Sequence, residues 1–408
     1  MKKLIILTST GGRGHISATQ ALKEYLKTEY QIKSVLAFQD PLAEMDLFSR
    51  ATSNRISSEN LYNILLQHKW SRTINALCVV GGWYFRLMHH HVTQLFINYF
   101  EKERPDLIIS VIPLINGALL DAAEHLNIPL VIVPTDLDSS TFVQGIMRPS
   151  FKKFRYCLPF NNHMIKKTIE HAGLTNSQIS ISGFPIRVDF FEQKDRVALL
   201  QKHHIPNNAS VILVMLGGLG CTELIRIIQN LNTIAIPVHL LVCIGKSKSL
   251  QETISLIVLP RHISITIIGF TDRVSDLMAI SDLFITKSGS VSVCEALYMN
   301  LPMFLDGGTC PLTWERLNHH YIKTQHAGDS ITNYKKMPEL VTRLLGNKKR
   351  ILSIKQEMVH NKKPDPRSQF KIILNELLLS SVSSVRTYQS VAYPDACYRD
   401  KKEQSPVQ

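Results

Sequence analysis

A glycine-rich turn with a histidine lies close to the N-terminus, in the stretch TSTGGRGHISA that begins at Thr8. It follows an apolar run typical of a short buried strand and precedes apolar residues at helical spacing, which predicts a strand-turn-helix unit. Gly12 and Gly14 would let the backbone turn tightly and approach a ligand closely. His15 would stand at the helix start, where the helix dipole disfavours the imidazolium, so we expect a neutral base near pH 7.

A second glycine-rich turn opens the second half of the chain, in the stretch LVMLGGLGCTE. It repeats the arrangement of strand, glycines and helix, with Gly217, Gly218 and Gly220 before a helix predicted to begin near Cys221. The free amides at a helix start favour phosphate, because they point at the ligand and carry partial positive charge. This turn therefore predicts a phosphate site.

A third turn, FITKSGSVSVCEAL, carries hydroxyls and a carboxylate at a predicted helix start. The turn residues are Ser288, Gly289, Ser290 and Ser292. About one helical turn further on, Glu295 would accept hydrogen bonds from both hydroxyls of a ribose. The alternative for Glu295 is structural, with a carboxylate that simply benefits from the helix dipole.

Nearly continuous apolar runs separate these turns, as expected of strands buried on both faces of a parallel sheet. The runs in the first half are 3–9, 33–38, 106–113, 129–135, 156–160 and 179–183. Helical patterns fall between them, for example at 115–126 and 163–172, and a second series of strands and helices starts at Ser210. This alternation predicts an α/β fold with two Rossmann-like domains that bind a ligand between their strand ends.

The length of 408 residues agrees with two domains rather than one. We place an N-terminal domain at 1–190, a C-terminal domain at 191–379 with a last helix able to pack back on the first domain, and a disordered tail at 380–408. The polar stretch 188–208 is the predicted link between the domains.

The chain has 46 Lys and Arg against 33 Asp and Glu, a formal charge of +13. This excess predicts an anionic partner, either nucleic acid, anionic lipid or a phosphorylated metabolite. No apolar run reaches the roughly 18 residues needed to span a bilayer. The N-terminal MKKLIILTSTGG lacks a signal-peptide cleavage site, so we expect a cytoplasmic protein.

A basic and aromatic segment at 54–103 interrupts the α/β pattern. Trp70, Trp83, Phe85 and Arg86 would contact a membrane surface if this segment forms interfacial helices. In the alternative, the aromatic side chains belong to the core of helices packed against the first sheet. The sequence fits both interpretations.

Four stretches together carry a family resemblance: GRGHISA, SGFPIRVDF, LGGLG and the block from Gly269 to Leu305. They resemble the monogalactosyldiacylglycerol synthase and processive diacylglycerol glucosyltransferase family, which has the GT-B fold of two Rossmann-like domains. The peptidoglycan N-acetylglucosaminyltransferase is a more distant relative of that family. The resemblance extends from about Lys2 to Leu379, and the Gly269–Leu305 block is its most specific part.

The resemblance implies an inverting transfer of a hexose from a UDP-sugar to a lipid hydroxyl such as that of diacylglycerol, without a metal or another cofactor. His15 and Asp136 match the acceptor-side residues that act as the base or orient it, and Gly12 and Gly14 belong to the acceptor loop. Glu295 matches the glutamate that binds the donor ribose. The other donor-side residues implied are Gly217, Gly218, Gly220, Phe270, Ser288, Gly289, Ser290, Ser292, Glu315 and Asn318.

The sequence also departs from the family pattern. Ser140 and Val143 stand where a histidine and a tryptophan usually follow the Thr-Asp pair, and Ser290 stands where a second glycine is usual. The stretch GGTCPLTWERLN replaces the usual donor loop. The donor side is thus closer to the family than the acceptor side.

Three other functions remain as alternatives. A UDP-sugar epimerase of the same fold would share the donor side but needs further carboxylates, and a non-catalytic sugar-nucleotide or lipid-binding protein would explain the changed acceptor loop. Nucleic-acid binding has the least support, because the basic residues are spread along the chain. The leading hypothesis is a glycosyltransferase bound peripherally to the inner face of an anionic membrane.

Overall fold

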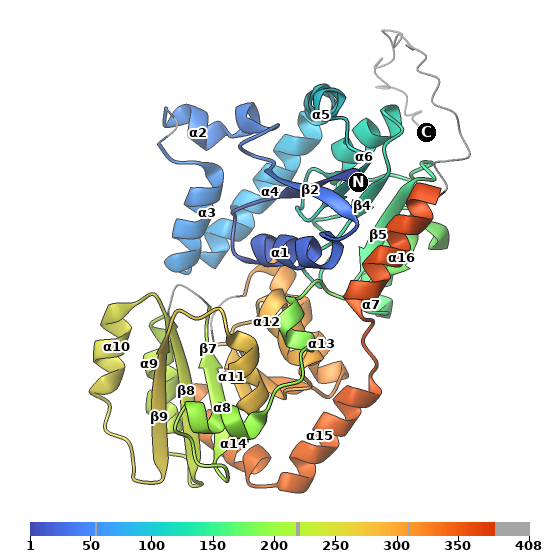
Figure 1. The fold of residues 1–408 in the computed structure, drawn as a ribbon. Helices are drawn as coiled ribbons and strands as arrows, with labels where there is room; N and C mark the ends of the chain where they lie inside the picture. Colours follow the sequence, from blue (N-terminus) through green and yellow to red (C-terminus); the bar gives the residue numbers. More distant parts are fainter. Residues whose placement is uncertain (54, 218–220, 309–310, 380–408) are drawn as a thin grey trace, which may run out of the picture.

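The computed structural model describes residues 1–53, 55–217, 221–308 and 311–379, and shows two α/β domains stacked on each other (Figure 1). Each domain is built on a six-stranded sheet in which all strand pairs are parallel. The predicted α/β fold with two Rossmann-like domains is therefore confirmed. The tail at 380–408 lies outside the described residues.

The first sheet has the strand order β2-β1-β3-β4-β5-β6. Its strands are β1 (Lys2–Thr8), β2 (Tyr30–Leu36), β3 (Leu107–Ser110), β4 (Leu130–Ile132), β5 (Phe154–Leu158) and β6 (Ile179–Ile181). The helices of this part are α1 (Gly14–Leu26), α2 (Leu47–Ala51), α3 (Ser58–Gln67), α4 (Ser71–Leu87), α5 (His89–Glu103), α6 (Asn116–His125) and α7 (His163–His171).

The second sheet has the strand order β12-β11-β10-β7-β8-β9. Its strands are β7 (Ser210–Met215), β8 (Val238–Gly245), β9 (Ile263–Gly269), β10 (Leu283–Thr286), β11 (Met303–Asp306) and β12 (Gly328–Ile331). The helices are α8 (Arg196–Lys202), α9 (Glu223–Leu231), α10 (Lys248–Ser255), α11 (Val274–Ile280), α12 (Ser290–Tyr298), α13 (Arg316–Thr324), α14 (Met337–Leu345) and α15 (Lys348–His360).

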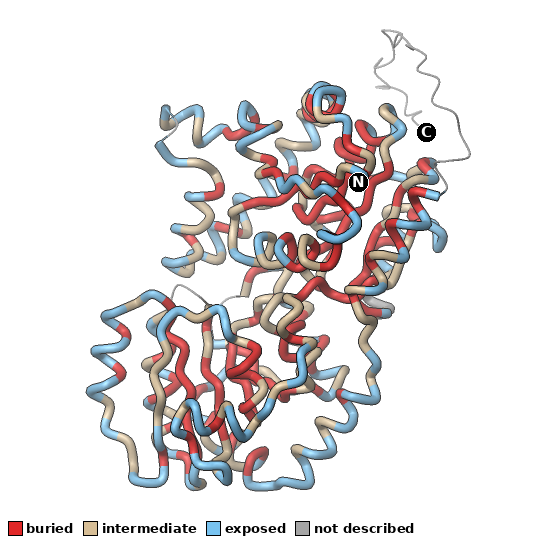
Figure 2. Tube along the Cα trace, in the orientation of Figure 1, coloured by how far each residue is buried: buried red, intermediate tan, exposed pale blue. Residues whose placement is uncertain are grey.

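Most of the central strands are apolar along their length because helices cover both faces of each sheet, and Figure 2 shows these buried strands inside the more exposed helices. In β1, Ile5 and Leu7 face the core beneath α5 and α6, whereas Leu4 and Ile6 face the opposite side. A strand buried in this way has no polar face, which explains the continuous apolar runs of the sequence.

The last helix of the described chain, α16 (Pro366–Leu379), returns to the first domain. It packs beside α1 over the first sheet, as Figure 1 shows, and its apolar side chains complete the core on that face. The rings of Phe370 and Tyr25 stack there with centroids 6.5 Å apart. The chain therefore crosses between the domains twice, once after β6 and once between α15 and α16.

The predicted elements of the first half are present with bounds that differ by a few residues. The predicted link at 188–208 is wrong in part, because it contains α8, which is capped by Asp195 and packs against α11. Strand β12 was not predicted, because Asp329 and Ser330 interrupt its apolar pattern. In the described part of the chain, none of the helices is long and apolar enough to cross a bilayer.

Candidate active site

The predicted site residues lie where the carboxyl ends of the two sheets meet. In the first sheet the strand order reverses between β1 and β3, and in the second sheet it reverses between β7 and β10. Ligands of open α/β sheets bind outside the strand ends at such switch points, because the loops diverge there. His15 follows β1, while Gly217 and Ser288 follow β7 and β10. The site is thus built by both domains.

The His15 ring joins the two strands of the first switch point. Its Nδ1 lies 2.7 Å from the carbonyl oxygen of Val111, just after β3, and 3.0 Å from Oγ1 of Thr135. A carbonyl oxygen only accepts, so Nδ1 carries the proton and Nε2 keeps its lone pair. Burial lowers the pKa of His15, and the imidazole is neutral at pH 7.

A buried glutamate that the sequence did not single out holds the glycine-rich turn in place. Glu59, in the first turn of α3, accepts hydrogen bonds from Ser9 Oγ at 2.5 Å, from the Thr10 amide at 2.7 Å and from Thr10 Oγ1 at 2.6 Å. Gly12 has a φ of 76°, which favours glycine, and its amide donates to Asn63 Oδ1 at 2.9 Å. Helix α3 therefore shapes the acceptor loop, although SENLYN reads as an ordinary helix start.

Asp136 lies just after β4 and contacts the second domain directly. Ser290 Oγ donates to Asp136 Oδ1 at 3.0 Å, from the first residue of α12. Ser290 is held in turn by Asn318, whose Nδ2 donates to Ser290 Oγ at 3.0 Å and to the Ser288 carbonyl oxygen at 2.5 Å. Asn318 is fully buried and holds the turn between Ser288 and Ser290 through these two bonds.

The surroundings of Asp136 make its carboxyl a base poised near neutral pH. Desolvation raises the pKa of Asp136 to about 7, against the hydrogen bond from Ser290, which lowers the pKa. The negative charge of Glu315 raises the pKa further, and the positive charge of Lys287 lowers it. A carboxylate with a pKa near the working pH is suited to accept a proton from a hydroxyl.

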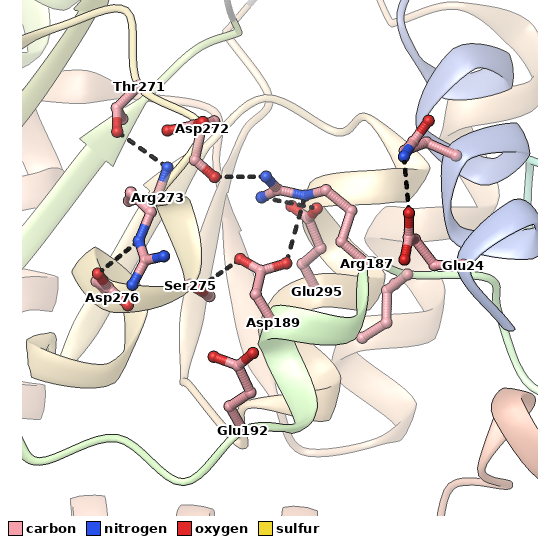
Figure 3. A network of polar contacts seen from close by, with 12 residues as sticks. Glu24, Arg187, Asp189, Glu192, Thr271, Asp272, Arg273, Ser275, Asp276 and Glu295 are labelled. Atoms are coloured by element: carbon pink, nitrogen blue, oxygen red, sulfur yellow. Dashed lines mark hydrogen bonds and ion pairs between the residues drawn. The ribbon is translucent and has the colours of Figure 1, made fainter.

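Glu295 lies inside the domain interface and meets an arginine of the first domain (Figure 3). Arg187 Nη2 is 3.9 Å from Glu295 Oε1, and Arg187 Nη1 donates to the Asp272 carbonyl oxygen at 2.5 Å. Burial raises the pKa of Glu295 to about 8, although the Arg187 charge opposes this rise. Sequence reasoning overlooked Arg187 even though it belongs to the SGFPIRVDF stretch.

The remaining donor-side residues surround the same loop. Ser288 Oγ donates to Glu315 Oε2 at 3.1 Å, while Gly289 caps α12 and Ser292 lies half-buried in its first turn. Gly217 has a φ of 106°, and a Cβ there would meet the Lys287 side chain at 3.5 Å. Gly218 and Gly220 lie outside the described residues.

Phe270 marks a positively charged edge of the interface. Its ring is half exposed at the end of β9. The Arg13 guanidinium, from the first domain, lies 4.9 Å from the ring centroid, and the Lys246 ammonium lies 5.2 Å from it. With Lys287, these cations place positive charge around the donor loop. The sequence signal for Lys287 was its position directly before Ser288 in TKSGS.

The basic and aromatic segment forms α3, α4 and α5, and much of its apolar surface is exposed. Trp70 is 60% exposed, Trp83 is 69% exposed, and the Arg86 guanidinium lies 6.0 Å from the Trp83 ring centroid. Phe85 differs, because it is half-buried and packs against Phe38. The segment thus combines the two interpretations of its sequence, with an outer apolar face and an inner core face.

The inner side of this segment contacts the second domain. Leu312 is buried in an apolar cluster with Leu65 and Ile74, and the Thr313 amide donates to Asn75 Oδ1 at 3.0 Å. Lys69, between α3 and α4, forms an ion pair with Glu223 of the second domain. Helices α3 and α4 therefore pack against the donor-side loop at 311–315 with their inner side, while the outer face of α4 stays exposed.

Two family models of known proteins match this chain. The family model for monogalactosyldiacylglycerol (MGDG) synthase matches residues 15–186, and the glycosyltransferase family 28 C-terminal domain matches residues 211–306. The first match lies in the N-terminal domain and the second in the C-terminal domain. The chain is a glycosyltransferase with the GT-B fold, and it resembles the MGDG synthase family.

Full-length relatives of this glycosyltransferase support the same relationship. The processive diacylglycerol beta-glucosyltransferase of Staphylococcus haemolyticus is 26% identical, over 88% of this chain and 89% of that protein. The protein of the same name from Bacillus subtilis is 23% identical, over 93% and 96% of the two chains. The family resemblance drawn from the sequence is confirmed.

Solved structures place the glycosyltransferase among known GT-B folds. Acinetobacter baumannii MurG matches with a TM-score of 0.61 and 13% identity, over 92% of this chain and all of that chain. The S. aureus MnaA-UDP co-structure matches with a TM-score of 0.56 and 13% identity, over 94% and 98%. At such low identity these two structures support the fold alone.

Proposed function

We propose that this glycosyltransferase moves a hexose from a UDP-sugar to the hydroxyl of diacylglycerol, with inversion at the sugar carbon and without a metal ion. The observation that carries this proposal is the hydrogen bond between Asp136 and Ser290, because it joins a first-domain carboxyl to the donor loop. The names of the full-length relatives support diacylglycerol as the acceptor and a glucosyl group as the sugar. The matched family models describe glycosyltransferases and give no support to an epimerase.

The reaction follows from the placement of the charges. Asp136 takes the proton of the acceptor hydroxyl, the oxygen forms a bond to the sugar carbon, and the bond from that carbon to UDP breaks. The departing diphosphate carries away the electron pair, and the amides at the start of α12 together with Lys287 and Arg13 favour its negative charge. The His15 ring contacts the side chain of Thr135, the residue directly before Asp136. This contact holds the acceptor loop in place.

The direct experiment uses the full chain, a panel of UDP-sugars and diacylglycerol in anionic vesicles, with lipid products identified by mass spectrometry. We expect one hexosyl product with the β configuration from an α-linked donor, and the same yield with a metal chelator present. An absence of lipid product with every donor, while UDP still binds, would favour the non-catalytic alternative.

We predict that Glu295→Gln weakens UDP binding by at least about tenfold, because a carboxylate accepts charge-assisted hydrogen bonds from the ribose worth roughly 1.5 to 3 kcal/mol each. The pKa of Glu295 is about 8, so the ionised form increases as the pH rises through 8. The affinity of the wild type for UDP should therefore rise between pH 7 and 9. Calorimetry of the variant should show no such rise in UDP affinity. An equal rise in both proteins would exclude Glu295 as a ligand of the ribose.

We further propose that the enzyme binds the membrane surface through the outer face of α4. The exposed apolar residues of this face are Leu77, Val79, Val80, Trp83 and Leu87. Exposed Arg72 and Arg86 flank them, and each basic residue near an anionic surface adds about 1 kcal/mol of attraction. An amphipathic helix of this kind lies in the membrane interface without crossing it.

Cosedimentation with vesicles tests this surface. We expect binding to increase with anionic lipid, to decrease with salt, and to weaken about tenfold or more in Trp83→Ser, since burial of a large apolar side chain contributes about 1.5 to 3 kcal/mol. Leu256→Ser is the matched control, because Leu256 is an apolar side chain that is also largely exposed, on the other domain. Equal binding of wild type and Trp83→Ser would contradict the proposed surface.

A further inference from the structure

Three side chains form a hydrogen-bonded series across the domain interface, and the direction of each bond is fixed. Asn318 Nδ2 faces the Ser288 carbonyl oxygen, which only accepts, so the amide nitrogen is correctly placed. The same nitrogen donates to Ser290 Oγ. The Ser290 hydroxyl therefore uses its lone pair for Asn318 and its single proton for Asp136 Oδ1, 3.0 Å away.

We propose that Ser290 is a positioning residue for the transfer reaction, and that its hydroxyl, supplied by the donor domain, orients the Asp136 carboxylate and keeps it ionised when the two domains are closed. This proposal rests on the proposed role of Asp136 as the base.

The charges around Asp136 explain why a donor is needed. Desolvation and the carboxylates of Glu315 and Asp138 disfavour ionisation of Asp136, whereas Lys287 and the Ser290 hydroxyl favour it. The Tyr62 hydroxyl and the Cys294 thiol also interact electrostatically with this carboxyl, but burial raises the pKa of both groups, and they stay neutral. Within the described residues, Ser290 is the sole hydrogen-bond donor to Asp136.

The two oxygens of the Asp136 carboxyl differ in their hydrogen bonds. Ser290 occupies Oδ1, while Oδ2 accepts no hydrogen bond from any residue that the structure describes. Oδ2 is thereby left for the acceptor hydroxyl. Because Asp136 and Ser290 belong to different domains, opening of the interface removes the donor from the base. The base is complete only when the donor domain has closed over the acceptor side.

The first test is the pH dependence of kcat/KM for the full-length enzyme between about pH 5.5 and 9.5. Without the Ser290 hydroxyl, Asp136 holds its proton to higher pH. We expect Ser290→Ala to move the acidic limb upward by about one pH unit, which is about a tenfold loss below pH 7. Ser290→Thr keeps a hydroxyl and should retain the wild-type limb. Ser281→Ala removes another buried hydroxyl of the same domain, one that donates to the Leu277 carbonyl oxygen, and should leave the profile unchanged.

An infrared titration of the Asp136 carboxyl provides a readout that needs no substrate. The signal is the difference between each protein and the same protein with Asp136→Asn. We expect the carboxyl to titrate at higher pH in both Ser290→Ala and Ser290→Gly than in the wild type. Identical titrations in all three would overturn the proposal. If the wild type forms no lipid product, the proposed function fails, but this titration still decides whether Ser290 controls the ionisation of Asp136.

Discussion

Replacement of Asp136 by asparagine is expected to lower kcat by about a hundredfold to ten-thousandfold, the range that a general base contributes. The amide has the same shape and its oxygen still accepts the hydrogen bond from Ser290, so the domains close as in the wild type. Only the proton acceptor is lost. The dissociation constant of UDP, measured by calorimetry, should therefore stay close to that of the wild type.

The pH dependence of the wild type gives an independent check. Because the pKa of Asp136 is about 7, the base form is lost as the pH falls through 7, and kcat/KM should fall with it. His15→Ala is the comparison variant. If His15→Ala abolishes transfer while Asp136→Asn retains most of it, the base is the free Nε2 of His15 and the two roles are exchanged.

The second large effect concerns stability. Phe370→Ala should destabilise the first domain by roughly 3 to 5 kcal/mol, because it leaves a cavity where a fully buried ring packs on Tyr25. The loss should appear in the first domain, although Phe370 follows the whole second domain in the sequence. Ile372→Ala is the matched control, since Ile372 is about half exposed on the same helix.

Hydrogen exchange measures this effect locally, which avoids treating a two-domain protein as a single cooperative unit. Amides of β1 should exchange at least about a hundredfold faster in Phe370→Ala than in the wild type. Amides of β8 should be unaffected. Equal acceleration in both sheets would show that α16 stabilises the whole molecule and not the first domain alone.

The parts of this fold that follow from local patterns were predictable. A strand buried on both faces is apolar throughout, so runs such as LIIL in β1 identified the parallel sheets. The glycine-rich turn before His15 was predictable as well, because Gly12 has a positive φ that few other residues adopt. Strand β12 escaped prediction because it is short and polar at Asp329 and Ser330.

The contacts between residues that are distant in the sequence were not predictable from periodicity. Glu59, Arg187 and Lys69 take their roles from partners that are distant in the sequence, and nothing in their immediate neighbours indicates those partners. The family resemblance supplied Asp136 and Glu295, but it could not show that Ser290 joins the first of them to the donor domain. The role of Ser290 follows from its position in the folded protein and not from its residue type.

The return of α16 to the first domain has a consequence for synthesis of the chain. The strands β1 and β3 leave the ribosome early, yet α1 alone covers their face toward α16 until residues 366–379 have been made. On one face of β7 the core consists of second-domain residues only, so this part of the second domain can form before that point. The domain translated first is therefore completed last, and part of its apolar sheet is exposed to aggregation and to chaperones for nearly the whole time of translation.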